Sequence, residues 1–130
     1  MKTVASAARY NAFREFQARV KSGMGRYLTA EDIARRASYM TSEIFQTVPG
    51  LAIEADGEES FVYMRGVTGP CVPAYYVNGA LLFNLSTREL DAFVRIKDVI
   101  GIEVYAGAAA PPQFQPGLSG CGSIVIWTRS

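Results

Sequence analysis

The chain has 130 residues, of which 49% are hydrophobic and 19% charged, a composition typical of a single globular domain and unlike that of disordered or fibrous proteins. Its net charge of +1 excludes a bulk electrostatic attraction to nucleic acid or to an anionic membrane. Histidine is absent and cysteine occurs only twice, which excludes His-dependent catalytic sites and the usual zinc sites, so we expect no metal and no cofactor.

The first part of the chain is more basic than the rest. Residues 1–36 contain eight Lys or Arg and three acids, whereas residues 37–130 contain five and nine. The basic side chains alternate with Ala, Ser and Gln, which is typical of a solvated face and not of a nucleic-acid site. No run approaches the roughly 20 apolar residues of a membrane-spanning helix, and Arg9 and Asn11 interrupt any signal-peptide core. We therefore expect a soluble chain without a nucleic-acid partner.

An N-terminal helix is predicted because several apolar residues before Gly23 share part of one helical face. These residues are Tyr10, Phe13, Phe16 and Val20. We expect residues 1–26 to form a basic helix or linker and residues 27–130 to form the folded domain.

A second helix is predicted after Thr29, a favourable N-cap residue, with Glu31 and Asp32 in the first turn, where the helix dipole favours acids. Apolar residues then recur every three or four positions, which predicts one continuous helix that ends at Pro49. This apolar stripe consists of Ile33, Ala37, Met40, Ile44 and Val48.

A first hairpin is predicted from two strand-like runs, residues 51–55 and 60–65, which flank the polar turn Asp56–Glu59. Clustered carboxylates in such a turn could serve a metal or acid–base site. Acidic turn tips are more often simply solvated, and we expect that here.

A second hairpin pairs residues 74–77 with residues 80–83 through Asn78 and Gly79. Both turn residues readily adopt the positive φ angles that a two-residue type I′ turn requires. This turn is the strongest local structural signal in the sequence.

The last elements are a short helix and two strands. Ser86 and Glu89 match a capping box, which predicts a helix that begins after Ser86. Residues 99–105 alternate between an apolar face and a mixed face, as in a half-buried strand. Residues 106–122 are rich in Pro and Gly and long for a loop, which indicates a functional or mobile segment. Residues 123–128 are almost continuously apolar, which predicts a central strand. The mixed face of the strand predicted at residues 99–105 carries Gly101, Glu103 and Tyr105.

Together these elements predict an α+β domain with a small mixed β-sheet and two packing helices, preceded by the N-terminal helix. The two cysteines, Cys71 and Cys121, each lie just ahead of a predicted strand. They form either a disulfide, worth about 4 kcal/mol for a loop of about 50 residues, or two separate buried thiols. A nucleophilic Cys121 is disfavoured, because no histidine is present to activate it and Cys71 is available to oxidise it.

Six short patterns between Tyr27 and Arg129 resemble, in the same order, segments of the plug domain of TonB-dependent outer-membrane receptors. No single pattern is specific to the family. The resemblance depends on all six patterns occurring in the same order as in the family. Asn78 stands where that family usually has Asp, and the Pro-rich residues 109–116 replace a usual Tyr-Gly-Ser segment. We recognise no Ton box, the N-terminal segment that the energy-coupling protein TonB binds in this family. The patterns are TAEDIARR, FQTVPGLAI, YMRG, PAYYVNGALL, IGIEVYAGAAAPPQF and GCGSIVIWTR.

The resemblance implies a gating and ligand-contact module that is not an enzyme. Its implied partners are a transmembrane β-barrel, in cis or in trans, and a TonB-type energy-coupling protein that pulls the plug aside. The implied ligand is an unknown small molecule or oligomer, and the implied location is the outer membrane, facing the periplasm. The cysteine pair resembles a subgroup in which the third and last strands are joined, which suits an oxidising compartment.

The resemblance also implies contact residues for the ligand or the barrel wall. Three of them are charged strand residues, which are more often ordinary surface charges. Tyrosines on the strands could line a ligand surface but are more often cross-strand packing pairs. The candidate contact residues are Arg65, Gly66, Asn78, Gly79, Glu103, Gly107 and Arg129, and the tyrosines are Tyr63, Tyr75, Tyr76 and Tyr105.

The sequence is also compatible with one other non-catalytic function. The chain could be a free-standing periplasmic binding or adaptor domain that reuses the plug fold. In that case the basic helix, residues 9–21, would be its partner interface.

Overall fold

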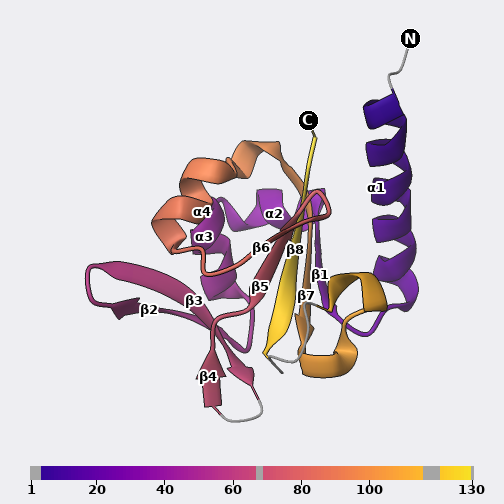
Figure 1. The fold of residues 1–130 in the computed structure, drawn as a ribbon. Coiled ribbons are helices and arrows are strands. Elements are labelled where there is room, and N and C mark those ends of the chain that lie inside the picture. Colours follow the sequence, from indigo (N-terminus) through magenta and orange to yellow (C-terminus); the bar gives the residue numbers. More distant parts are fainter. Residues whose placement is uncertain (1–3, 67–68, 116–120, 130) are drawn as a thin grey trace.

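The computed structural model describes residues 4–66, 69–115 and 121–129 (Figure 1). Its α-helices are α1 (Val4–Ser22), α2 (Ala30–Arg36), α3 (Thr41–Ile44) and α4 (Thr87–Phe93). Its strands are β1 (Arg26–Thr29), β2 (Leu51–Asp56), β3 (Glu59–Gly66), β4 (Gly69–Cys71), β5 (Ala74–Val77), β6 (Ala80–Leu82), β7 (Val99–Ala106) and β8 (Gly122–Thr128). Short 3₁₀ turns are η1 (Phe45–Thr47), η2 (Ile96–Asp98), η3 (Gly107–Ala109) and η4 (Pro112–Phe114). Residues 116–120 of the predicted loop lie outside the described residues.

The strands are divided between two sheets, where one was expected. A five-stranded sheet has the order β1-β7-β8-β5-β6, and a three-stranded sheet has the order β2-β3-β4. Strands β5 and β8 are parallel, and the other pairs are antiparallel, so the larger sheet is mixed. The predicted α+β class is confirmed. The predicted central strand is confirmed too, since all residues of β8 are buried.

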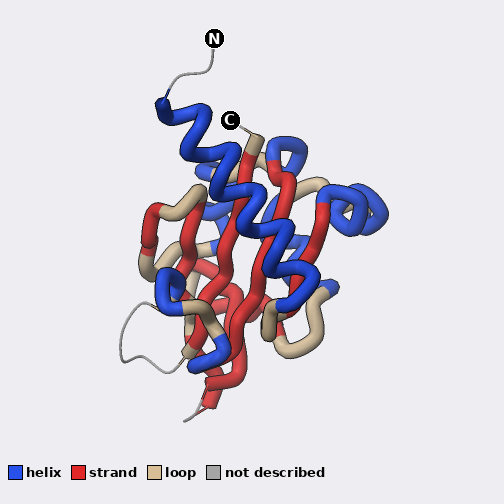
Figure 2. Tube along the Cα trace, turned by 90° about the vertical axis from the view of Figure 1, so that its right-hand side faces the viewer, coloured by secondary structure: helices blue, strands red, loops and turns tan. Residues whose placement is uncertain are grey.

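The five-stranded sheet is covered on both faces. Helices α2, α3 and α4 lie on one side of it and α1 on the other (Figure 1). Figure 2 shows α1 crossing the strands obliquely over the second face. Each face has its own hydrophobic core, and α1 contributes Phe13, Phe16 and Val20 to the second one. Tyr10, the remaining residue of the predicted stripe, is half exposed.

The expectation of one helix from residue 30 to residue 48 was wrong. Helix α2 ends at Arg36, because the C-cap residue Ala37 has a left-handed backbone with φ 50°, and the exposed Met40 precedes a separate helix α3. The break is fixed from outside the segment, because Asp91 of α4 accepts hydrogen bonds from the Ser42 amide (2.7 Å) and hydroxyl (2.6 Å). Strand β1, which precedes this segment, was not predicted.

Helices α2 and α4 both begin with a capping box. The Thr29 hydroxyl accepts from the Asp32 amide, and the Asp32 carboxylate accepts from the Thr29 amide at 2.9 Å. Ser86 and Glu89 form the same reciprocal pair, as predicted. Hydrogen bonds to the backbone and side chain of Ser86 hold the pKa of Glu89 below its usual value.

The Asp32 capping box gives a first testable prediction. The backbone hydrogen bond from Thr29 lowers the pKa of Asp32, so its stabilisation is present above the unfolded-state pKa of about 4 and is lost as pH falls through the folded-state value. Asp32→Asn should therefore reduce the free energy of unfolding by about 1 kcal/mol at pH 7. Urea unfolding between pH 2 and pH 7 measures the difference, which should disappear at the acid end. The exposed Glu31→Gln serves as the control, and an equal effect of both variants would contradict the prediction.

The predicted disulfide is present. The Sγ atoms of Cys71 and Cys121 are 2.14 Å apart, and the bond joins the end of β4 to the residue that precedes β8. It therefore links the three-stranded sheet to the five-stranded sheet. Neither cysteine is a free thiol, which removes the nucleophile that the enzyme reading of Cys121 required.

None of the described helices is both long enough and apolar enough to cross a bilayer.

Candidate functional site

The predicted contact residues fall into three groups along the central strand β8. Arg65 and Gly66 end β3 next to the disulfide, since Met64 is paired with Cys71 and Gly66 with Gly69. The Gly107 amide donates a hydrogen bond to the Cys121 carbonyl at 3.1 Å. Arg65, Gly66 and Gly107 are therefore brought together at the start of β8.

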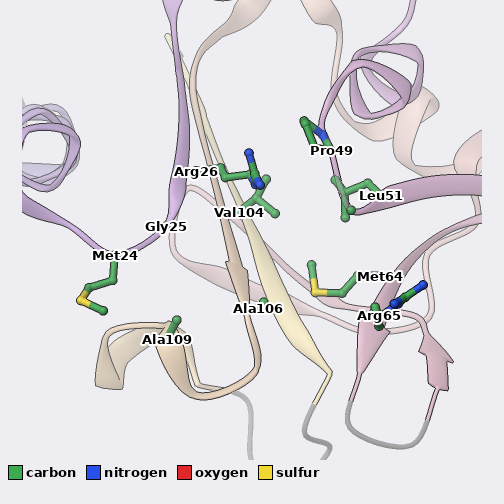
Figure 3. A pocket seen from close by; sticks show the side chains of 11 residues that line it. Met24, Gly25, Arg26, Pro49, Leu51, Met64, Arg65, Val104, Ala106 and Ala109 are labelled. Atoms are coloured by element: carbon green, nitrogen blue, oxygen red, sulfur yellow. The ribbon is translucent and has the colours of Figure 1, made fainter.

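A groove of about 550 Å³ adjoins this first group (Figure 3). It lies between the β1–β7 edge of the large sheet and the start of β2. Met64 and Val104 are buried in it, while Arg26 and Arg65 are exposed on either side. Within the described residues, no acid forms an ion pair with either arginine. The groove therefore offers an apolar surface with two available cations.

The second group lies at the other end of β8. Asn78 and Gly79 form the predicted turn, with φ angles of 51° and 90°. The Asn78 side chain donates to the Thr128 hydroxyl (2.8 Å) and accepts from the Thr128 amide (3.0 Å). The exposed Arg129 donates its amide to the Asp98 carbonyl at 2.9 Å. The side-chain amide of Asn78 therefore connects the β5–β6 hairpin to the end of β8.

Glu103 lies between these two ends, opposite Val125, and its side chain is fully buried. The Arg19 guanidinium binds both of its carboxylate oxygens, at 2.7 Å and 2.9 Å. The Trp127 indole donates to the same carboxylate at 2.7 Å, and the Tyr105 hydroxyl also donates a hydrogen bond to it. The reading of Glu103 as an ordinary surface charge is wrong, because the carboxylate is the centre of a buried polar network.

The Arg19 side chain is held by an aromatic ring as well as by the carboxylate. Its guanidinium carbon lies 5.0 Å from the centre of the Phe114 ring, within the range of a cation–π contact. Burial alone would lower the pKa of Arg19, but the hydrogen bonds and negative charge of Glu103 outweigh it and raise that pKa. The Arg19 guanidinium therefore keeps its positive charge at all ordinary pH values.

The sheet surface is shaped to receive α1. A Cβ atom at Gly101 would come within 2.6 Å of the Phe16 ring, so only glycine leaves room for that ring. A Cβ atom at Gly25 would come within 2.5 Å of the Tyr105 ring. The predicted mixed face of β7 is thus the face under α1, where Gly101 accommodates Phe16 and Glu103 binds Arg19.

The buried tyrosines give a second testable prediction. Burial raises the pKa of Tyr75 and, together with the hydrogen bond to Glu103, that of Tyr105. These phenols therefore stabilise the fold below the unfolded-state pKa of about 10, and that stabilisation is lost as pH rises. In an alkaline absorbance titration, the phenolate signal should rise in two stages, the second coinciding with unfolding. Tyr105→Phe should reduce the second stage, whereas Tyr39→Phe, at an exposed site, should leave it unchanged. A single stage, complete before unfolding, would contradict this.

The remaining predicted residues lie in an exposed turn or take part in ordinary packing. The Asp56–Glu59 turn is largely exposed, and Glu59 contacts Arg88. No group of three potential metal-ligating side chains occurs within the part of the chain that the structure describes. Tyr75 and Tyr76 are buried, and Tyr63 stacks edge-on against Phe61.

Sequence reasoning missed Arg19, Phe114 and Trp127 as members of the polar network. One available signal was the spacing of Arg19, three residues after Phe16, which places it on the apolar face of its helix. The other was an acid in an otherwise apolar strand. Neither signal identifies the other partner, because 84 residues separate Arg19 from Glu103.

The comparisons with known proteins point to one family. The family model described as TonB-dependent Receptor Plug Domain matches residues 19–120. Among solved structures, a variant of the ferric enterobactin receptor of Pseudomonas aeruginosa is similar, with a TM-score of 0.65 and 26% identity. The ferric yersiniabactin uptake receptor of Yersinia pestis (TM-score 0.59, 24% identity) and the RagAB peptide importer (0.58, 20%) share the fold. A search of curated proteins gave no match.

The similarity covers most of this chain but little of those proteins. It spans 87% of this chain and 18% of the enterobactin receptor. For the yersiniabactin receptor and the importer it spans 83% of this chain and 17% and 12% of theirs. The chain therefore corresponds to less than a fifth of each of these proteins.

Proposed function

Because the chain belongs to the family of TonB-dependent receptor plug domains, we propose that it is the gating and ligand-contact module of a TonB-dependent outer-membrane transporter. The family match over residues 19–120 is the observation that carries this proposal. The strand order and the covered sheet are consistent with a self-supporting module. The role is one of binding and gating, not of catalysis.

Two partners follow from this role. The first is a transmembrane β-barrel, in cis or in trans, whose interior the module closes. The second is a TonB-type energy-coupling protein that acts on the N-terminal side. The relatives are described as receptors and an importer, which supports an outer-membrane location facing the periplasm. The Cys71–Cys121 disulfide suits such an oxidising compartment.

The groove beside Arg26 and Arg65 is the proposed ligand-contact surface. Its two exposed cations and buried Met64 and Val104 favour an anion with an apolar body over a neutral polar ligand. The relatives are described as acting on ferric enterobactin, ferric yersiniabactin or peptides, so they do not point to one ligand class. We also propose the exposed Arg129, at the far end of β8, as a contact to the barrel wall.

The gating role can be tested with an emptied barrel. The chain would replace the plug of the enterobactin receptor, and vancomycin sensitivity of the host bacteria would report on passage through the barrel. Bacteria carrying the chimera should survive concentrations that kill bacteria carrying the empty barrel. A flexible linker of equal length serves as the control. Equal sensitivity of chimera and linker, with the chimera correctly inserted, would reject the gating role.

No observation favours the free-standing adaptor over this function. The apolar residues of the predicted interface helix, Phe13, Phe16 and Val20, pack against the chain's own sheet. Arg19 of the same helix binds Glu103.

A further inference from the structure

The disulfide divides the chain into a closed loop and two open arms. Cys71 and Cys121 are separated by 50 positions. The loop between them contains β5, β6, α4 and β7, and β8 follows directly after Cys121. The elements that precede Cys71 are α1, β1, α2, α3, β2 and β3, with β4 ending at Cys71 itself.

Cys71 also separates the strands of the two sheets into those that precede it and those that follow it. In the five-stranded sheet, β1 is an edge strand, so its removal leaves β7, β8, β5 and β6 as a contiguous four-stranded sheet. The other strands before Cys71 belong to the separate three-stranded sheet. Apart from β1, every strand of the five-stranded sheet therefore follows Cys71. The arm before Cys71 adds this edge strand, the separate three-stranded sheet and the helices α1, α2 and α3, together with their part of the hydrophobic core.

We propose that the disulfide sets the limit to which the plug domain opens under tension. The inference rests on the proposed function, in which an energy-coupling protein pulls on the N-terminal side. Tension that enters ahead of α1 runs along the chain to Cys71 and then crosses the S–S bond to Cys121. The loop between the two cysteines carries none of it. Residues before Cys71 are released, while β5, β6, α4 and β7 stay folded around β8.

The contacts across this boundary are the ones that tension must break. One of them is the buried Arg19–Glu103 ion pair, which joins α1 to β7, and another is the antiparallel pairing of β1 with β7. Ser42 is hydrogen-bonded to Asp91, and the Thr41 hydroxyl donates to the Val94 carbonyl at 2.7 Å. These contacts are non-covalent, whereas the link at Cys71 is covalent. Stepwise release of the arm, with an arrest at the disulfide, follows from that difference.

Force spectroscopy on the full chain, held by handles at its two ends, measures the arrest directly. The oxidised chain should reach a contour length shorter than the reduced chain by about 170 Å, which is 50 positions at about 3.4 Å each. In the control variant Cys71→Ser/Cys121→Ser, the long contour length should appear without reductant. Equal contour lengths for the oxidised chain and this variant would overturn the proposal.

A second pair of variants tests the order of release. Arg19→Ala should lower the force of the first rupture in the oxidised chain and leave its final contour length unchanged. Arg14→Ala is the matched control, because Arg14 is an exposed arginine of the same helix, and it should leave the rupture force unchanged. A first rupture that releases residues after Cys121, while the residues before Cys71 remain folded, would also overturn the proposal. These readouts need no barrel, so they are independent of the vancomycin test of the gating role.

Discussion

Replacing Arg19 with alanine is expected to destabilise the domain by about 3 kcal/mol, because removal of one partner leaves the other charge buried and uncompensated. Glu103 is fully buried, and Arg19 binds both of its carboxylate oxygens. The loss is large against the roughly 5–15 kcal/mol that stabilises a typical domain. Urea unfolding monitored by the fluorescence of Trp127, the only tryptophan, measures it.

Two further variants separate the charge from the helix that carries it. Arg14→Ala should change the free energy of unfolding by less than about 0.5 kcal/mol, since Arg14 is exposed. Combining Arg19→Ala with Glu103→Gln should recover part of the loss, because the unpaired charge is then removed. A loss below about 1 kcal/mol for Arg19→Ala would show that water replaces the guanidinium without cost.

Reduction of the disulfide is expected to destabilise the domain by about 4 kcal/mol, the chain-entropy value for a loop of about 50 residues. With an m-value of about 2 kcal/mol per molar urea, the unfolding midpoint should fall by roughly 2 M. The comparison needs oxidised protein, fully reduced protein and the variant Cys71→Ala/Cys121→Ala.

The reduced protein and the double variant should agree, because both lack the cross-link. Coinciding curves for oxidised and reduced protein would mean that Cys71 and Cys121 remain together in the unfolded state. The measurement is independent of the force experiment, since stability and contour length respond separately to the loss of the bond.

The elements that the sequence predicted correctly are specified by neighbouring residues. Asn78 and Gly79 form their turn with positive φ angles, and Ser86 and Glu89 form the capping box that their spacing indicates. The continuous apolar run after Gly122 identified the central strand. In each case the physical cause lies within a few residues of the element.

The features that were missed depend on residues far away in the chain. The helical stripe through Ala37 and Met40 is interrupted because Asp91 of α4 caps a new helix at Ser42. The division into two sheets depends on which strand edges meet, which periodicity does not specify. Arg19 and Glu103 each give a weak local signal, and only the fold shows that they meet.

The hollow at Gly101 that holds the Phe16 ring has a practical consequence for where the chain can be cut. A fragment that begins at Tyr27 lacks both the Phe16 ring and the Arg19 guanidinium, so we expect part of the aromatic surface around Trp127 and Tyr105 to become exposed to solvent. Bare aromatic surface of this kind promotes self-association. Light scattering should therefore rise with the concentration of the fragment, whereas the intact chain should remain clear.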